Sequence, residues 1–185
     1  VLNGDISGTV SFSDFQNESC GFNSVATCTI SGTVKHCTAL TNSFGYASTL
    51  CTISGTIKHC TGTSGCFGFS GVTDAIISGS VEYCDGGASC FASAGNGTGT
   101  ISGSVKKCTA GNYSFSFGYS VAGIISGTVD TCTAGIYSFA TSANTVTMSG
   151  SIINCNASDD SFAHSDFTTP TVSGTFKDCT GGLRC

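Results

Sequence analysis

A pattern of eight residues recurs along the whole chain, and within it apolar positions alternate with small polar ones. In the copy at 101–108 it reads Ile, Ser, Gly, Ser, Val, two variable residues and Cys. The copies begin at Ile6, Ile30, Ile53, Ile77, Ile101, Ile125, Met148 and Val172, so successive copies are 23 or 24 residues apart. Self-similarity at one period predicts a solenoid, in which each repeat buries its apolar side against its neighbours.

The repeat is numbered here from 1 at its Ile. Positions 1 and 5 are β-branched in most copies and positions 2 and 4 are small hydroxyl residues, which predicts a short strand with one buried face. Gly at position 3 points inward by parity, and this indicates a close backbone approach or a bend. A second apolar element recurs at positions 14 and 15 of the repeat. It predicts a column of stacked phenylalanines, namely Phe44, Phe67, Phe91, Phe115, Phe139 and Phe162.

The predicted fold is therefore all-β, a single β-solenoid or parallel β-helix over residues 1–185, with eight coils of 23–24 residues and the last coil incomplete. A helical repeat is the competing architecture. The 26 Gly residues, the abundant Ser and Thr and the lack of sustained i, i+3, i+4 apolar spacing argue against it. A coil of this length suits three short strands and three bends, with about 4.8 Å between coils.

Charge excludes several classes of function. Only 9% of residues are charged and the net charge is −5, so the chain lacks a basic patch for nucleic acid or a polybasic membrane signal. No run approaches the roughly 20 apolar residues of a membrane span.

The 13 Phe and 39% hydrophobic content can supply a core if coils stack. The start at Val1 without Met fits a mature chain or a truncated one.

Cysteine usage points to an extracellular or cell-surface location. Thirteen cysteines in 185 residues favour an oxidising setting. Four Asn-x-Ser/Thr sequences, at Asn17, Asn96, Asn112 and Asn156, are candidate N-glycan acceptors that point the same way.

The cysteines fall into three groups. Seven occupy position 8 and predict an inward column, either of buried unpaired thiols or of bonded ones: Cys37, Cys60, Cys84, Cys108, Cys132, Cys155 and Cys179. Cys28 and Cys51 each lie just before the Ile of adjacent coils, two residues ahead of it. Cys66 and Cys90 share position 14 of adjacent coils. Each of these two pairs is expected to lie about 4.8 Å apart, so they are candidate intra-chain disulfides.

The last two cysteines, Cys20 and Cys185, lie in the first and last coils and are too far apart to bond within one molecule. Their repeat positions differ by one, so in a head-to-tail polymer Cys185 of one subunit meets Cys20 of the next. A bond from Cys179 to Cys185 is the rival pairing. Neither end of the array carries a visible cap, and open strand edges favour head-to-tail homopolymers, which we predict.

Neither a metal or cofactor site nor a catalytic site is predicted. His36-Cys37 and His59-Cys60 are adjacent pairs, but the chain has no Cys-x-x-Cys and an inward column of thiols does not converge tetrahedrally. Asp159, Asp160, His164 and Asp166 form the one acidic concentration. Because no companion cluster occurs in neighbouring coils, we interpret it as a solvated loop of a non-enzymatic protein.

The hydroxyl positions support an alternative function. Positions 2 and 4 form two outward ranks, Ser7/Thr9, Ser31/Thr33, Ser54/Thr56, Ser78/Ser80, Ser102/Ser104, Ser126/Thr128, Ser149/Ser151 and Ser173/Thr175. Their expected spacing is about 4.8 Å between coils and about 6.8 Å along the strand. This resembles the Thr-x-Thr arrays of insect-type ice-binding solenoids, whose flat face orders water. The first rank is always Ser, which lacks the methyl group that such faces use.

The Gly/Ser/Thr-rich coils, the Cys-Thr and Asn-Cys steps and the low charge resemble secreted β-solenoid surface proteins. Within that group, the chain is similar to the cysteine-rich, amyloid-like sheath proteins of some methanogenic archaea. The resemblance implies a structural subunit of an extracellular sheath, filament or surface layer, polymerised by strand stacking and locked by disulfides. Ice binding is the alternative function, and a surface adhesin of unidentified ligand is a third.

Overall fold

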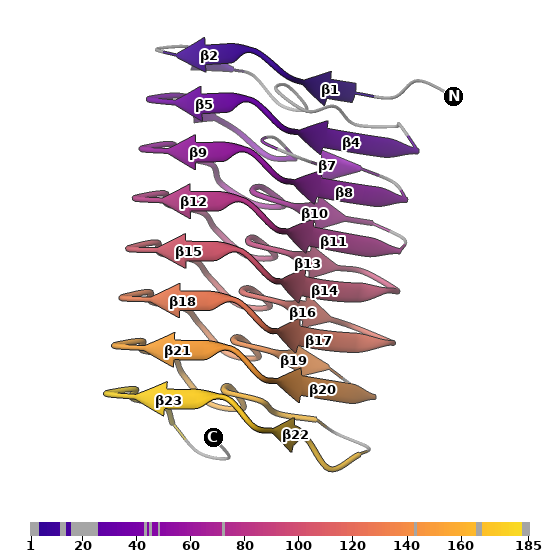
Figure 1. Cartoon of the computed structure of the whole chain (residues 1–185), viewed down its shortest axis with the longest axis vertical. Helices are drawn as coiled ribbons and strands as arrows, with labels where there is room; N and C mark the ends of the chain where they lie inside the picture. The colour runs from indigo at the N-terminus through magenta and orange to yellow at the C-terminus, as the bar shows by residue number, and fades with distance from the viewer. Residues whose placement is uncertain are drawn as a thin grey trace.

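The computed structural model describes residues 4–11, 14–15, 26–42, 44, 46–47, 49–71, 73–142, 144–165 and 168–182. Every regular element within these ranges is a β-strand, and every strand pairing is parallel. The chain winds as a β-solenoid in which corresponding residues of successive turns lie one above another (Figure 1). The predicted all-β solenoid is confirmed.

Two eight-stranded sheets form most of the wall. Sheet A contains β1 (Gly4–Ile6), β4 (Thr27–Ile30), β8 (Leu50–Ile53), β11 (Asp74–Ile77), β14 (Thr98–Ile101), β17 (Ala122–Ile125), β20 (Thr145–Met148) and β22 (Thr171–Val172). Sheet B contains β2 (Thr9–Ser11), β5 (Thr33–Lys35), β9 (Thr56–Lys58), β12 (Ser80–Glu82), β15 (Ser104–Lys106), β18 (Thr128–Asp130), β21 (Ser151–Ile153) and β23 (Thr175–Lys177). The register keeps repeat position on repeat position, as Ile77 on Ile101 shows.

Each coil closes through two further ladders. Sheet C is formed by β7 (Tyr46–Ala47), β10 (Phe69–Ser70), β13 (Ser93–Ala94), β16 (Phe117–Gly118) and β19 (Thr141–Ser142). The pair β3 (Asp14–Phe15) and β6 (Thr38–Ala39) is continued by single bridges, beginning with Thr38 to Thr61 and ending with Asn156 to Thr180. A coil therefore contains four stacked segments, where the sequence pattern predicts three strands.

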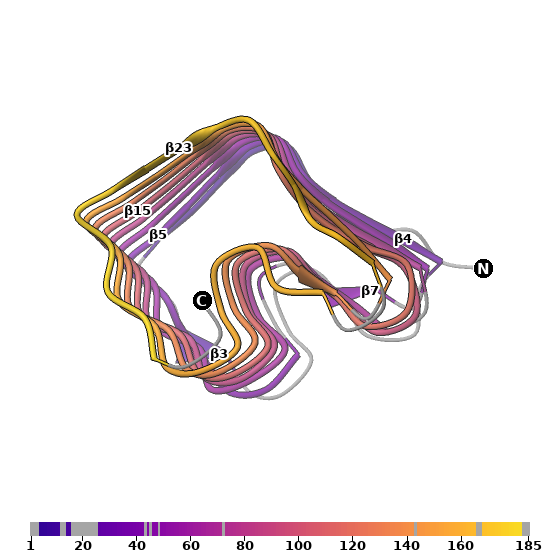
Figure 2. The ribbon, with the colours of Figure 1, turned by 90° about the horizontal axis from the view of Figure 1, so that it is seen from below.

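The expected single strand over positions 1–5 is wrong, because the chain turns a corner between sheets A and B at positions 2 and 3 (Figure 2). The N–H groups of Ser102 and Gly103 both donate to the carbonyl of Ile77 in the preceding coil, at 2.9 and 3.0 Å. Two successive donors on one acceptor break the extended ladder. A Cβ on Gly103 would lie 2.1 Å from the carbonyl oxygen of Gly79, so the close approach predicted for position 3 is confirmed.

The core consists of columns that run along the solenoid. Ile101 and Val105, at positions 1 and 5, are both fully buried, as are their equivalents in the central coils. The phenylalanine rings at position 15 are parallel, with 4.8 Å between the centroids of Phe91 and Phe115 and 3° between their planes. The predicted aromatic column is thus confirmed, and its spacing equals the separation of stacked strands.

The bends of each coil depend on residues in the left-handed backbone region. At position 7 the φ angles lie between 51° and 55° for His36, His59, Tyr83, Lys107, Thr131, Asn154 and Asp178. The phenylalanines at position 15 have φ between 53° and 63°. A non-glycine residue in this region costs about 1–3 kcal/mol. The ladder hydrogen bonds hold it there, as in the donation from the Tyr83 N–H to the Lys106 carbonyl at 3.0 Å.

The corner generates a test of the stacking. We expect Gly103→Ala to lower the free energy of unfolding by about 2 kcal/mol, because the added methyl group meets a backbone carbonyl that cannot move independently. Gly8→Ala is the matched control, since Gly8 occupies the same repeat position with no atom within 4 Å of the added Cβ. Urea unfolding followed by circular dichroism measures both. Equal effects of the two substitutions would contradict the packing described here.

Candidate functional site

The surfaces that stack coil on coil form the first candidate site. At the edge formed by β22 and β23, Val172 is 49% exposed and Phe176 is 38% exposed, whereas their equivalents Ile101 and Val105 are fully buried. At the opposite edge, Ile6 and Val10 of β1 and β2 pack partly buried against the core. Each edge therefore presents the same two apolar columns and the same two strand directions.

The described strands at these edges contain few of the charges that normally discourage strand pairing. Soluble sheets protect their edges with inward charges, bulges or covering segments. On β22 and β23 the one charged residue is Lys177, and on β1 and β2 it is Asp5. The inward positions are apolar at both edges. The edge surfaces are consequently compatible with a further coil.

The outward hydroxyl ranks of positions 2 and 4 do not lie on one flat strand. Ser102 and the other position-2 serines of the central coils are exposed at the corner, and Ser104 and Thr128 begin strands of sheet B. Some of these hydroxyl groups serve local contacts, as in the donation from Ser80 Oγ to Glu82 Oε1 at 2.8 Å. The two ranks therefore lie on either side of a bend.

A further rank in direct register lies on the outer face of sheet A, one residue before position 1. It contains Thr29, Thr52, Ile76, Thr100, Ile124, Thr147 and Thr171 in direct register. All seven carry a β-branched methyl group and five also carry a hydroxyl. Sequence reasoning missed this rank, although alternation before the Ile in Thr98-Gly99-Thr100 and Thr145-Val146-Thr147 could have revealed it.

The position-8 cysteines form the expected inward column, in which Cys37 to Cys155 are buried and Cys179, in the last coil, is partly exposed. Cys108 is 1% exposed, and its Sγ contacts the Lys106 carbonyl oxygen at 3.2 Å, a contact that recurs in the other coils. Burial raises the pKa of the Cys108 thiol well above its usual range. These residues pack as small apolar side chains with a weak hydrogen bond.

The two predicted intra-chain pairs are adjacent in the structure. Cys28 and Cys51 are register partners in sheet A and are buried together with Ala47. Cys66 and Cys90 belong to a position-14 ladder in which each backbone N–H donates to the side chain of the next coil. The Cys66 N–H donates to Cys90 Sγ at 3.3 Å and the Cys90 N–H donates to Ser114 Oγ at 3.1 Å. The disulfides themselves stay predictions, and Cys20 and Cys185 lie outside the described residues.

The acidic loop does not form a compact site within the described part of the chain. Asp159 is exposed and Asp160 is buried, while His164 lies beside Tyr137, with 6.2 Å between the ring centroids. Asp166 lies outside the described residues. Among the residues that the structure describes, no three His, Cys, Asp or Glu side chains are grouped to hold a metal ion.

The candidate glycan acceptors Asn96, Asn112 and Asn156 are exposed, and Asn17 lies outside the described residues. The Asn112 side chain also has a structural contact, because its Oδ1 accepts the Ile136 N–H at 3.0 Å. Modification of these residues stays a prediction.

Comparisons with protein-family models, with curated proteins and with solved structures found no match. A search of the described residues found no helix long and apolar enough to cross a membrane. The inferences about function below therefore depend on the geometry of this chain.

One ion pair on the sheet B face supports a pH-dependent prediction. Lys58 Nζ lies 3.0 Å from Glu82 Oε2, and the hydrogen bond from Lys58 lowers the pKa of the Glu82 carboxyl group. The pair is partly exposed, so we expect it to contribute only about 0.5 kcal/mol. This contribution is present above the unfolded-state pKa of Glu and is lost as the pH falls through the lowered folded-state pKa. Glu82→Gln should therefore destabilise the protein at pH 7 but not at pH 2.

Urea unfolding at the two pH values measures this difference, and Lys58→Met with the double variant completes a cycle that isolates the pair. A coupling free energy that is the same at both pH values would contradict the assignment.

Proposed function

We propose that this protein is a non-enzymatic structural subunit that self-assembles by stacking coil on coil into an extracellular sheath, filament or surface layer. The observation that carries the proposal is the translational equivalence of the two sheet edges. A copy displaced along the solenoid axis places its β1 and β2 where the next strands of sheets A and B would lie. The contact between copies then repeats the contact between coils.

The apolar columns favour this contact. In the stacked arrangement Ile6 and Val10 of one copy cover Val172 and Phe176 of another, which removes apolar surface from water. Backbone N–H and C=O groups at the edges gain the partners that strands inside the sheets already have. Because the two contacting surfaces differ, the interface is heterologous and gives an open filament unless the rotation closes a ring.

The repeat positions of Cys20 and Cys185, which differ by one, support a covalent step. We infer that Cys185 of one subunit and Cys20 of the next are oxidised to a disulfide, with two protons and two electrons passing to an oxidant such as glutathione disulfide. The abundance of cysteine and the resemblance to methanogen sheath proteins agree with an extracellular building block. A surface adhesin stays the third hypothesis.

The edge contact is tested by adding charge to the apolar positions. We expect the double variant Val172→Asp, Phe176→Asp to prevent filament formation, because two carboxylates would have to be buried without partners. The matched control is Ser173→Asp, Thr175→Asp, which adds the same charge to outward positions of the same coil. Electron microscopy and sedimentation velocity measure assembly. Filaments in both variants, or a monomeric wild type at all concentrations, would overturn the proposal.

The covalent step has a separate readout. After incubation of the protein with glutathione disulfide, non-reducing electrophoresis should show a ladder of multimers. The ladder should disappear when reductant is added, and it should be absent in the variant Cys20→Ser. Filaments without such a ladder would retain the stacking and remove the disulfide from the proposal.

A second candidate function is ice binding, and the rank on the outer face of sheet A favours it. This rank combines methyl and hydroxyl groups on the strands of one sheet, in direct register and with about 4.8 Å between coils. The corner position of the serines makes the ranks of positions 2 and 4 a less regular template.

Thermal hysteresis decides between the two faces. If sheet A binds ice, Thr100→Lys should abolish most of the activity, while Thr128→Lys on sheet B should leave it nearly unchanged. The reverse result would assign ice binding to the ranks of positions 2 and 4. Absence of hysteresis in the wild type would exclude the function.

A further inference from the structure

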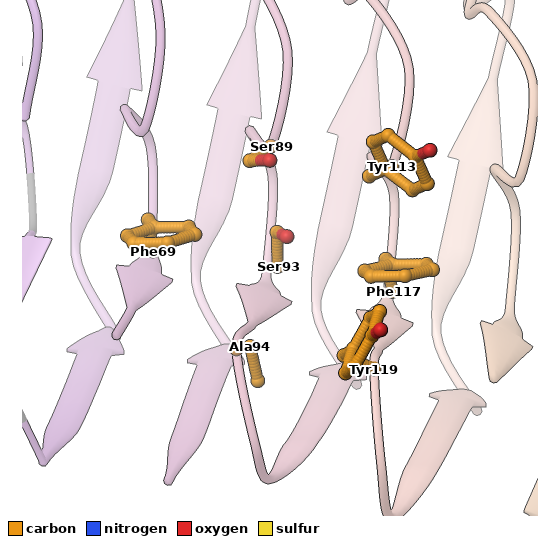
Figure 3. A pocket seen from close by; sticks show the side chains of 8 residues that line it. Phe69, Ser89, Ser93, Ala94, Tyr113, Phe117 and Tyr119 are labelled. Carbon is orange, nitrogen blue, oxygen red and sulfur yellow. The ribbon is translucent and has the colours of Figure 1, made fainter. Parts of the chain in front are cut away.

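An aromatic groove lies on the sheet C side of the solenoid, away from the stacking edges (Figure 3). Its volume is about 300 Å³, and its lining contains Phe69, Ser89, Ser93, Ala94, Gly95, Tyr113, Phe117 and Tyr119. This volume is at the lower end of the range for small-molecule sites. None of the lining residues is an acid, a lysine, an arginine or a histidine.

The groove exists because one coil lacks the rings that the next coil carries. Repeat positions 13, 17 and 19 are Ser89, Ser93 and Gly95 in one coil and Tyr113, Phe117 and Tyr119 in the following coil. Phe69 supplies the ring of position 17 on the other side of Ser93, and the three residues are aligned in sheet C. At position 17 a layer one coil thick is therefore missing between Phe69 and Phe117, while at positions 13 and 19 the preceding coil, with Gly65 and Gly71, also has no ring.

The rings beside this gap are held in fixed orientations. Tyr113 stacks on Tyr137 of the next coil, with 5.5 Å between centroids and 5° between planes, and it meets Phe117 edge to face at 5.0 Å. The next place in the Tyr113–Tyr137 stack belongs to Ser89, which has no ring. Tyr119 lies on the other side of Phe117, 62% exposed, with its ring tilted by 58°. Figure 3 shows Tyr113, Phe117 and Tyr119 on the coil to one side of Ser93 and Ala94, and Phe69 on the coil to the other side.

We propose that this groove binds a neutral sugar ring of a polysaccharide or glycan. A pyranose ring has a face of C–H groups and a rim of hydroxyl groups, so it can stack on Tyr113 while its hydroxyls reach the phenol groups and the half-buried Ser89 hydroxyl. Its thickness is about that of one coil, which matches the layer missing at position 17 between Phe69 and Phe117. Tyrosine suits such a ligand because it combines a large apolar face with a polar tip.

The uncharged lining selects against anionic sugars. A carboxylate or sulfate group in the groove would lose water without gaining a cation in return. The assignment does not depend on the proposed structural role, because the groove is present in each single chain.

Binding is tested by isothermal titration calorimetry of the full chain with neutral hexasaccharides, namely cellohexaose, maltohexaose and N-acetylchitohexaose. We expect at least one of them to bind and Tyr113→Ala to weaken that binding about tenfold, because a stacking surface is lost. Tyr83→Ala is the matched control, since Tyr83 is an exposed tyrosine outside the groove. It should leave the affinity unchanged.

Ser89→Tyr is a second variant, which distinguishes a lost binding surface from a folding defect caused by Tyr113→Ala. Ser89 and Tyr113 have φ angles of 56° and 59°, so a tyrosine at 89 fits the same backbone and continues the ring stack into the gap. It should abolish binding in a protein of unchanged thermal stability. Failure of all three oligosaccharides to bind, equal loss with Tyr83→Ala, or binding of indole without any sugar would overturn the proposal.

Discussion

The structure depends on one constraint, which is that every coil must lie on the previous one at the separation of hydrogen-bonded strands. The ring columns display this separation inside the protein, and the backbone ladders impose it on the wall. Position 3 of the repeat shows the constraint in every coil after the first, because the glycine carbonyl of the preceding coil lies where a side chain would begin. A residue type that fits this stacking in one coil therefore fits it in nearly all of them.

Stacking also explains how the coil tolerates an unusual backbone. Side chains as large as His59, Tyr83 and Phe115 adopt left-handed φ angles at the bends. An isolated turn would place glycine or asparagine there. In the solenoid, hydrogen bonds to the coils above and below fix each bend, and the side chains gain contacts in columns. His59 and Tyr83, for example, stack with 4.8 Å between ring centroids.

The same geometry separates the surfaces on which function can reside. The two edges repeat the internal contact and are apolar, the outer face of sheet A carries methyl and hydroxyl groups, and the sheet C side contains a groove where rings are missing. The proposed assembly along the axis would leave the lateral surfaces open. A filament of such subunits would therefore display each lateral site at regular intervals, which is compatible with a structural role combined with binding.

The sequence by itself determined the solenoid, its period, the columns at positions 1, 5, 8 and 15 and the close approach at position 3. These follow from identity between repeats, which needs no knowledge of distant contacts. The corner after Ile101, the left-handed bends and the groove at Ser93 were decided only by the tertiary structure. They depend on hydrogen bonds and gaps between coils, and a local pattern of apolar and polar residues does not specify which donor shares an acceptor or which ring lacks a neighbour.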